Sequence, residues 1–210
     1  MSHFTRHRRL LLQTIGTSLL TGCPWPQFFD LGWDEEVKLH SGRVIVVAMK
    51  YEYERLNGGF LNRYEPSILR DTTLTFDAGP PNGVTTQLFK GVRPALLDHE
   101  SGRWYVVLNG GHYGTSRLIP GQDWGPGQNS VEQHIAMLGN EGFVPVPIRR
   151  LPEAFKIPNL LLQYAPTKEL AAFNGTRITL VQKTQYLQKY PLGPGDMRIE
   201  RPQESIFKPT

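Results

Sequence analysis

Glu35-Glu36-Val37-Lys38-Leu39-His40, then Ser41-Gly42, then Arg43-Val44-Ile45-Val46-Val47 is the stretch of sequence that decides the fold. The first run alternates polar and apolar residues, and the second is rich in β-branched residues. Two such runs separated by a dipeptide that ends in glycine indicate a β-hairpin. We expect the second strand to continue through residues 51–54 and to stop at 57–59, where Asn-Gly-Gly breaks the pattern.

The same pattern recurs further along the chain and predicts a β-rich protein. Two further hairpins are expected, one from residues 72–76 and 85–89 and one from residues 95–98 and 103–107. Further strands are expected at 176–187 and at 143–148, where two prolines restrict the strand to a sheet edge. The fold class is therefore mainly β, with antiparallel hairpins in a meander that forms a sandwich or a barrel-like structure.

Two short helices are expected among these strands. In residues 130–138, Ser130 and Gln133 have the spacing of a capping box, and Gly139 follows as a stop. In residues 167–173, the helix would end at the Asn174-Gly175 pair.

The N-terminus differs from the rest of the chain. Arg6, Arg8 and Arg9 precede an uncharged, largely apolar run at residues 10–22, which is the order of a secretory signal peptide. The run is too short to cross a bilayer, since a spanning helix takes about 20 apolar residues. Arg8-Arg9 leaves open whether export follows the general or the twin-arginine route.

Leu20-Thr21-Gly22-Cys23, at the end of this run, resembles the bacterial lipobox, and Cys23 is the only cysteine of the chain. The resemblance implies that a signal peptidase recognises Leu20, Thr21 and Gly22 and cleaves before Cys23. It also implies that acyl chains such as palmitate are attached to Cys23. The protein would then be anchored in a lipid bilayer of the cell envelope and face the periplasm, with the choice between inner and outer membrane left open.

The excess of positive charge lies in the predicted signal peptide. Residues 1–22 contain three of the 23 basic residues and none of the 19 acidic ones, so the remainder carries 20 basic and 19 acidic residues. This balance, without a cluster of cations, argues against a nucleic-acid partner. We expect a signal peptide at 1–22, a tether at 23–32, a single β-rich domain at 33–190 and a polar, poorly ordered tail at 191–210.

A search for catalytic and metal-binding patterns gives little. No Gly-x-Ser-x-Gly or His-Glu-x-x-His motif occurs, and we expect neither a cofactor nor a metal site. His40 and His99 stand just before expected turns, where an exposed side chain is the simplest interpretation. The carboxylate pairs, Glu35 with Glu36 and Glu52 with Glu54, are expected on solvated strand faces.

Residues 110–129 are the remaining candidate for a site, because their density of glycine and proline argues against regular structure. His112, Tyr113, Asp123 and Trp124 lie in this segment and could line a pocket in which aromatic rings stack on a sugar. The alternative is an inert exposed loop whose tryptophan packs back onto the sheet.

Four segments together resemble a group of uncharacterised proteobacterial cell-envelope lipoproteins. They are residues 33–37 (WDEEV), 42–47 (GRVIVV), 151–155 (LPEAF) and 158–162 (PNLLL). The resemblance implies a β-rich envelope protein and carries no activity or site residues. The sequence thus favours a non-enzymatic, membrane-anchored lipoprotein that binds an envelope protein or glycan or has a structural role. The alternative is a carbohydrate-binding or hydrolytic protein that uses residues 110–129.

Overall fold

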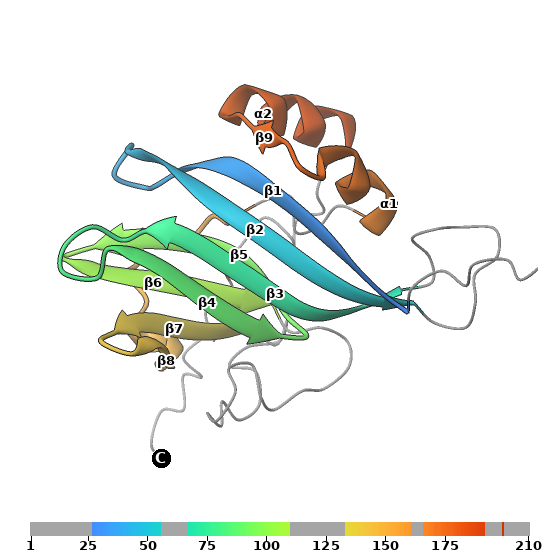
Figure 1. Ribbon diagram of the computed structural model, residues 1–210. Helices are drawn as coiled ribbons and strands as arrows, with labels where there is room; N and C mark the ends of the chain where they lie inside the picture. Colours follow the sequence, from blue (N-terminus) through green and yellow to red (C-terminus); the bar gives the residue numbers. More distant parts are fainter. Residues whose placement is uncertain (1–26, 56–66, 110–132, 161–165, 192–198, 200–210) are drawn as a thin grey trace, which may run out of the picture.

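The computed structural model describes residues 27–55, 67–109, 133–160, 166–191 and 199. In this part of the chain, nine strands form two sheets, and short helices lie beside the first sheet (Figure 1). The prediction of a mainly β fold built from antiparallel hairpins is therefore confirmed.

The first sheet has the order β4-β3-β2-β1-β9, and only the short β1–β9 pairing is parallel. Its strands are β1 (Phe28–Lys38), β2 (Val44–Arg55), β3 (Ser67–Asp77), β4 (Val84–Lys90) and β9 (Arg177–Ile178). The second sheet is antiparallel throughout and has the order β5-β6-β7-β8. Its strands are β5 (Arg93–Glu100), β6 (Arg103–Asn109), β7 (Gln133–Gly139) and β8 (Gly142–Pro145).

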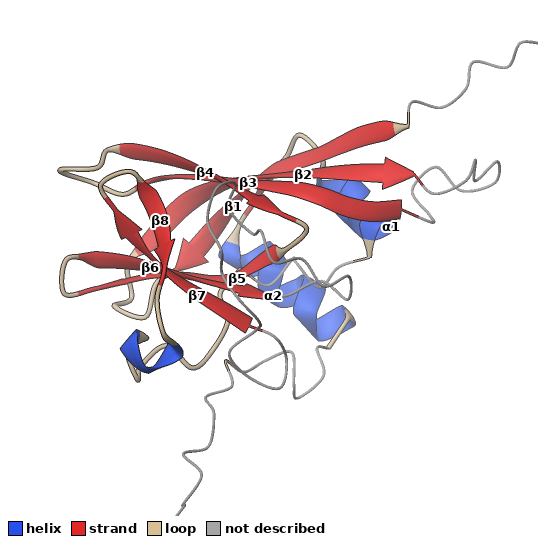
Figure 2. Cartoon of the chain, turned by 90° about the horizontal axis from the view of Figure 1, so that it is seen from below, coloured by secondary structure: helices blue, strands red, loops and turns tan. Residues whose placement is uncertain are grey.

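The helical elements are short and lie mostly near the C-terminal end of the described chain. They are η1 (Ile148–Arg150), α1 (Thr167–Leu170), η3 (Ala171–Phe173) and α2 (Leu180–Lys189). Figures 1 and 2 show α1 and α2 beside the β1 side of the first sheet. The helix predicted at 167–173 is thus present as a turn of α-helix followed by a turn of 3-10 helix.

The three predicted hairpins are present, and the first has the turn that its sequence requires. β1 and β2 pair from Phe28 opposite Glu54 to Lys38 opposite Val44. Gly42 closes the turn with a φ of 87°, a left-handed conformation that favours glycine. The second and third hairpins are β3–β4 and β5–β6.

The larger hydrophobic core fills the space between the inner faces of the two sheets. The first sheet contributes Trp33 and Tyr51, whose rings meet edge to face, and the second contributes Trp104. The indole of Trp104 packs against Phe76 and donates its Nε1–H to the carbonyl of Ala78 at 2.9 Å. The sheets are therefore joined by interlocking aromatic rings as well as by aliphatic side chains.

The second sheet is buried on both of its faces along β5 and β6. Leu96, Val107 and Ile135 point away from the first sheet into a second, smaller cluster with Phe155 and Ile199. This explains the continuous run of buried residues in β5 and β6, in contrast to the alternation in β1. Ile199 also donates its backbone N–H to the carbonyl of Lys156 at 3.0 Å, so at this residue the segment predicted to be a poorly ordered tail docks on the domain.

One side of the sandwich closes where β4 meets β8. The backbone N–H of Phe143 donates to the side-chain oxygen of Gln87 at 3.1 Å, in place of a strand-to-strand ladder. Gly142 has a φ of 118°, which favours glycine, and a Cβ at this position would lie 2.7 Å from that same oxygen.

Three sequence-based assignments are corrected by the structure. Within the predicted helix at 130–138, residues 133–138 belong to β7, because four successive residues from Gln133 are buried between β6 and β8. Of the strand predicted at 176–187, only β9 is a strand; Leu180 onward is helix α2. The first strand begins at Phe28, so residues 28–32 of the predicted tether belong to β1.

Helix α2 starts at a capping box that the interpretation as a strand overlooked. Thr179 accepts a hydrogen bond from the backbone of Gln182, and the Gln182 side chain accepts one from the backbone of Thr179. We expect Thr179→Ala to lower the free energy of unfolding by about 1 kcal/mol, as loss of an N-cap does. Urea unfolding followed by circular dichroism measures this difference.

The matched control is Thr184→Ala in the same helix, where the hydroxyl donates to the carbonyl of Leu180. Because such a bond adds little to a helix and alanine is a good helix former, we expect a change smaller than about 0.5 kcal/mol. Equal losses in the two variants would show that the cap contributes nothing.

Candidate functional site

The residues that sequence analysis singled out for function lie outside the described part of the chain. This applies to the lipobox residues Leu20, Thr21, Gly22 and Cys23, and to His112, Tyr113, Asp123 and Trp124. Both assignments stay predictions. The polar groups that the structure does bring together are elsewhere, at the β1 side of the sandwich.

Glu35 is the first of these groups, and its position corrects the prediction of a solvated carboxylate. Along β1, Leu31, Trp33, Glu35 and Val37 alternate with exposed or half-exposed residues and point into the core. Only 1% of the Glu35 side chain is exposed. Burial raises the pKa of its carboxyl group, because the charged form loses its hydration.

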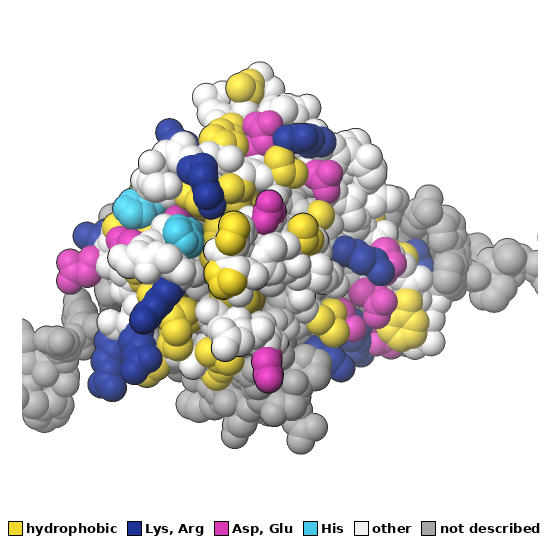
Figure 3. All heavy atoms as spheres, turned by 60° about the vertical axis from the view of Figure 1, so that its left-hand side comes forward, with side chains coloured by type: hydrophobic (Ala, Val, Ile, Leu, Met, Phe, Trp, Pro, Cys, Tyr) yellow, Lys and Arg dark blue, Asp and Glu magenta, His cyan; other side chains and the backbone are white. Residues whose placement is uncertain are grey.

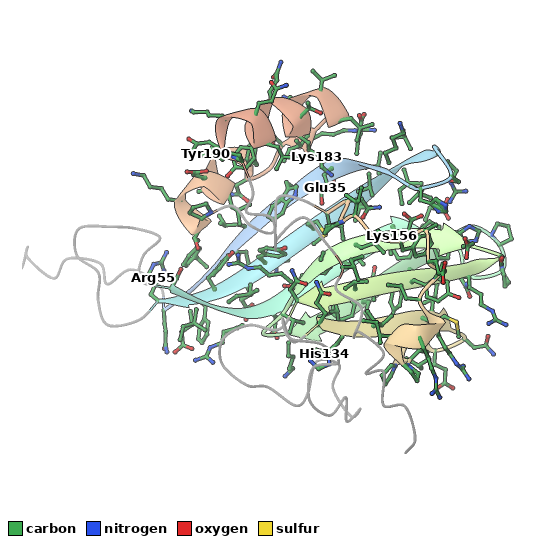
Figure 4. All side chains as sticks on the ribbon, turned by 180° about the vertical axis from the view of Figure 1, so that it is seen from behind. Glu35, Arg55, His134, Lys156, Lys183 and Tyr190 are labelled. Atoms are coloured by element: carbon green, nitrogen blue, oxygen red, sulfur yellow. The ribbon has the colours of Figure 1, made fainter. Side chains whose placement is uncertain are left out.

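Lys183, on α2, provides the opposite charge. Its Nζ lies 3.0 Å from Oε2 of Glu35, and only 5% of its side chain is exposed. The positive charge of Lys183 and its hydrogen bonding to Glu35 oppose the rise in the pKa of that carboxyl. Figure 4 shows Lys183 extending from α2 toward Glu35 on β1.

The same ammonium group also binds two backbone carbonyls. Nζ of Lys183 donates to the carbonyl of Glu36 at 3.0 Å and to the carbonyl of Asn159 at 2.9 Å. An ammonium group has three hydrogens, and here it has three oxygen neighbours. The ion pair is therefore embedded in the main chain of β1 and of the segment around Asn159.

Asn159 links the two sheets, at the edge strand β5 and at the end of β1 beyond its short pairing with β9. Its side-chain oxygen accepts from the backbone N–H of Leu97 at 3.0 Å, and its Nδ2 donates to the carbonyl of Leu97 at 2.8 Å. Nδ2 also lies 3.3 Å from the carbonyl of Lys38, at the end of β1. One amide group thus connects the main chains of β1 and β5.

Asp98, the next residue on β5, is buried and binds the backbone of two histidines. Its oxygens accept from the N–H of His40 at 3.0 and 3.2 Å and from that of His99 at 2.8 Å. Burial raises the pKa of Asp98, and the hydrogen bonds from His99 and His40 oppose this rise. Nδ2 of Asn159 approaches the same carboxylate at 3.4 Å.

The two histidine rings belong to the surface around this carboxylate. The ring of His40 meets Phe155 edge to face at 5.1 Å, and that of His99 lies 4.9 Å from Trp104. His40 is exposed and His99 is half-buried, and Figure 3 shows two histidine side chains close together on the surface. His134, expected in a helix, is instead buried in β7.

We call Glu35, Asp98, Asn159 and Lys183 the polar clamp. It connects β1, β5, the segment before α1 and helix α2, and its members bind one another or the main chain. Such an arrangement holds elements in register; it offers no exposed nucleophile or acid to a substrate. In the described ranges, no group of three or more His, Cys, Asp or Glu side chains could hold a metal ion.

Two signals in the sequence point to two members of the clamp, Glu35 and Lys183, one at a time. Glu35 lies two residues from Trp33 and two from Val37, and in a strand residues two apart point to the same face. A carboxylate on that face demands a cation, since a buried charge is costly unless it is paired. Thr179 and Gln182, the capping box, would have placed Lys183 on a helix.

None of the helices in the described ranges is long and apolar enough to cross a membrane. No protein-family model matches the sequence, and comparison with curated proteins and with solved structures found no significant similarity. The interpretation of this chain therefore depends on its own residues and geometry.

Removing the lysine of the ion pair should make the free energy of unfolding depend on pH. Lys183→Met would leave the Glu35 carboxylate buried without a partner, which costs about 3–5 kcal/mol. The pKa of Glu35, already raised, would rise further once the lysine is removed. The folded variant would then hold this proton at a higher pH than the unfolded chain does, so its free energy of unfolding should fall as pH rises above the ordinary range of a glutamate.

Urea unfolding at about pH 5 and about pH 8 measures the effect, and the loss in Lys183→Met should be larger at the higher value. The double variant Glu35→Gln with Lys183→Met is the control. It has no carboxyl group to titrate at this position and should recover part of the stability. A loss in Lys183→Met that is the same at both pH values would contradict the unpaired carboxylate as its cause.

The link between the sheets gives a second prediction. Asn159→Ala would leave the N–H and C=O of Leu97 without their partner, and each buried polar group left unpaired costs about 1–3 kcal/mol. We expect the free energy of unfolding to fall by about 2–4 kcal/mol, measured by urea unfolding.

Asn174→Ala is the matched control for that variant. Its side-chain oxygen also accepts from the edge of β1, from the N–H of Gly32 at 2.8 Å, but in an exposed position. Water can replace this partner, so the free energy of unfolding should fall by no more than about 1 kcal/mol. Similar losses for the two asparagines would show that Asn159 is no more than an ordinary surface contact.

Proposed function

We propose that this protein is a lipid-anchored lipoprotein of the bacterial cell envelope, with a binding or structural role and no catalytic activity. The observation that carries the proposal is Leu20-Thr21-Gly22-Cys23 at the end of a basic and then apolar N-terminal segment. The sole cysteine of the chain stands at the position that the lipobox requires.

The physical basis of such an anchor is the burial of acyl chains. Each buried methylene contributes about 0.8 kcal/mol, and stable attachment takes more than one chain. A diacylglycerol thioether on Cys23 together with an acylated amino terminus would supply three chains. The protein would then stay on the membrane without a spanning helix.

The position of the domain supports this proposal. β1 begins at Phe28, only five residues after Cys23, so a mature chain that starts at Cys23 would carry its folded domain close to the bilayer. A β-sandwich held by aromatic packing and by the polar clamp suits a protein that presents a fixed surface. We propose that this surface faces the periplasm and binds an envelope protein or a glycan.

Cys23→Ala tests the anchor. Cells that express the full chain are grown with a clickable fatty acid, and we expect the wild-type protein to be labelled and to sediment with membranes. The alanine variant should lose the label and accumulate as a longer, unprocessed precursor, because its thiol is the proposed acyl acceptor.

Ser18→Ala is the control, since it changes the apolar run but leaves the tetrapeptide intact; it should be labelled like the wild type. Acyl label retained by Cys23→Ala, or absent from the wild-type chain, would refute the proposed lipidation.

A further inference from the structure

The ends of the three strands β1, β2 and β3 meet at the N-terminal end of β1. The backbone N–H of Arg55, the last residue of β2, donates to the carbonyl of Gln27 at 2.8 Å. Arg55 also pairs with Ser67, the first residue of β3. We call Gln27, Phe28, Phe29, Arg55 and Ser67 the tether end of the first sheet. Figure 1 shows it projecting beyond the second sheet.

The tether end presents aromatic rings and a guanidinium group together. The ring of Phe29 stacks on Tyr53 at 5.3 Å, and the guanidinium carbon of Arg55 lies 4.3 Å from the centroid of the Phe29 ring. Phe28, on the other side of β1, is 47% exposed. Phenylalanine is among the residues that interfacial segments bury at the boundary between headgroups and acyl chains, and arginine is attracted to anionic headgroups.

We propose that the tether end is the surface that contacts the lipid headgroups, with Phe28 at the interface. This inference rests on the proposed acylation of Cys23. Phe28 is five residues from that cysteine, and a fully extended chain of this length spans at most about 18 Å. The anchor therefore keeps the tether end near the bilayer surface.

The opposite end of the same strands is held away from the membrane. Lys38 is ten residues further along β1, a distance of about 33 Å in a strand. Val44 lies opposite Lys38 at that end, and it is 47% exposed, as Phe28 is. The two residues are thus matched in exposure and lie at the two ends of one β1–β2 ladder, which makes them a pair of probes.

The experiment uses the full chain, expressed so that Cys23 is processed and acylated. Phe28→Cys and Val44→Cys each introduce one free thiol, because the only natural cysteine is occupied by lipid. The thiol is labelled with bimane, and the acylated protein is reconstituted into vesicles of phosphatidylethanolamine and phosphatidylglycerol that contain a lipid with a nitroxide in its headgroup. We expect the nitroxide to quench bimane at position 28 several-fold more than bimane at position 44.

A second pair of variants guards against a failure of Phe28→Cys to fold. Gln27→Cys and Ser41→Cys place the thiol on exposed residues outside the strands, at the tether end and at the turn between β1 and β2 respectively. The same ratio of quenching is expected. Circular dichroism of each labelled protein confirms that the β fold is retained.

The outcomes separate this inference from the proposed function. Acylated protein that remains on vesicles but is quenched equally at both ends, or more at positions 41 and 44, overturns the inference and leaves the anchor intact. Wild-type protein that carries no acyl label and does not bind vesicles overturns the proposed anchor, and the orientation fails with it.

Discussion

The buried carboxylate of Glu35 is the constraint from which much of the arrangement around β1 follows. A charge on the core face of a strand costs several kcal/mol unless a partner reaches it. Lys183 is that partner, so α2 has to lie against the side of β1. Glu36 reinforces this placement, since its carboxylate accepts from the backbone N–H of Leu180 at 3.1 Å, at the positive end of the helix dipole.

The polar clamp also binds main-chain groups that an open sandwich leaves unpaired at its strand edges. An edge strand exposes a row of unpaired N–H and C=O groups, and here the edge strand β5 lies close to the end of β1 that the short strand β9 does not cover. With one side chain, Asn159 binds the N–H and C=O of Leu97 on β5 and the carbonyl of Lys38 on β1, because an amide carries both donors and an acceptor. Lys183 then fixes the backbone of Asn159, so the charged pair and the neutral link depend on each other.

The sequence predicted local pairing well and contacts between distant segments poorly. Each hairpin was predictable because its strands are separated by a short turn, as at Gly42, and their alternation is visible in the sequence. The helix predicted at 130–138 rested on the capping-box spacing of Ser130 and Gln133 and on Gly139 as a stop. A short apolar run fits either structure, and pairing with β6 and β8 makes it strand β7. The clamp joins residues far apart in the chain, so no local pattern could place Lys183 beside Glu35.

The N-terminal position of β1 gives this architecture a mechanical consequence under the proposed anchor. A pull from Cys23 would enter the domain at Phe28 and act along β1. The strand pairs with β2 over its whole length, from Phe28 opposite Glu54 to Lys38 opposite Val44, so the ladder is loaded in shear. In shear, all the hydrogen bonds of a ladder resist together instead of opening one at a time. At the far end of the strand, Asn159 and Lys183 bind the carbonyls of Lys38 and Glu36, and these contacts oppose the same displacement. The strand nearest the proposed anchor is therefore held along its whole length by β2 and at its far end by the polar clamp.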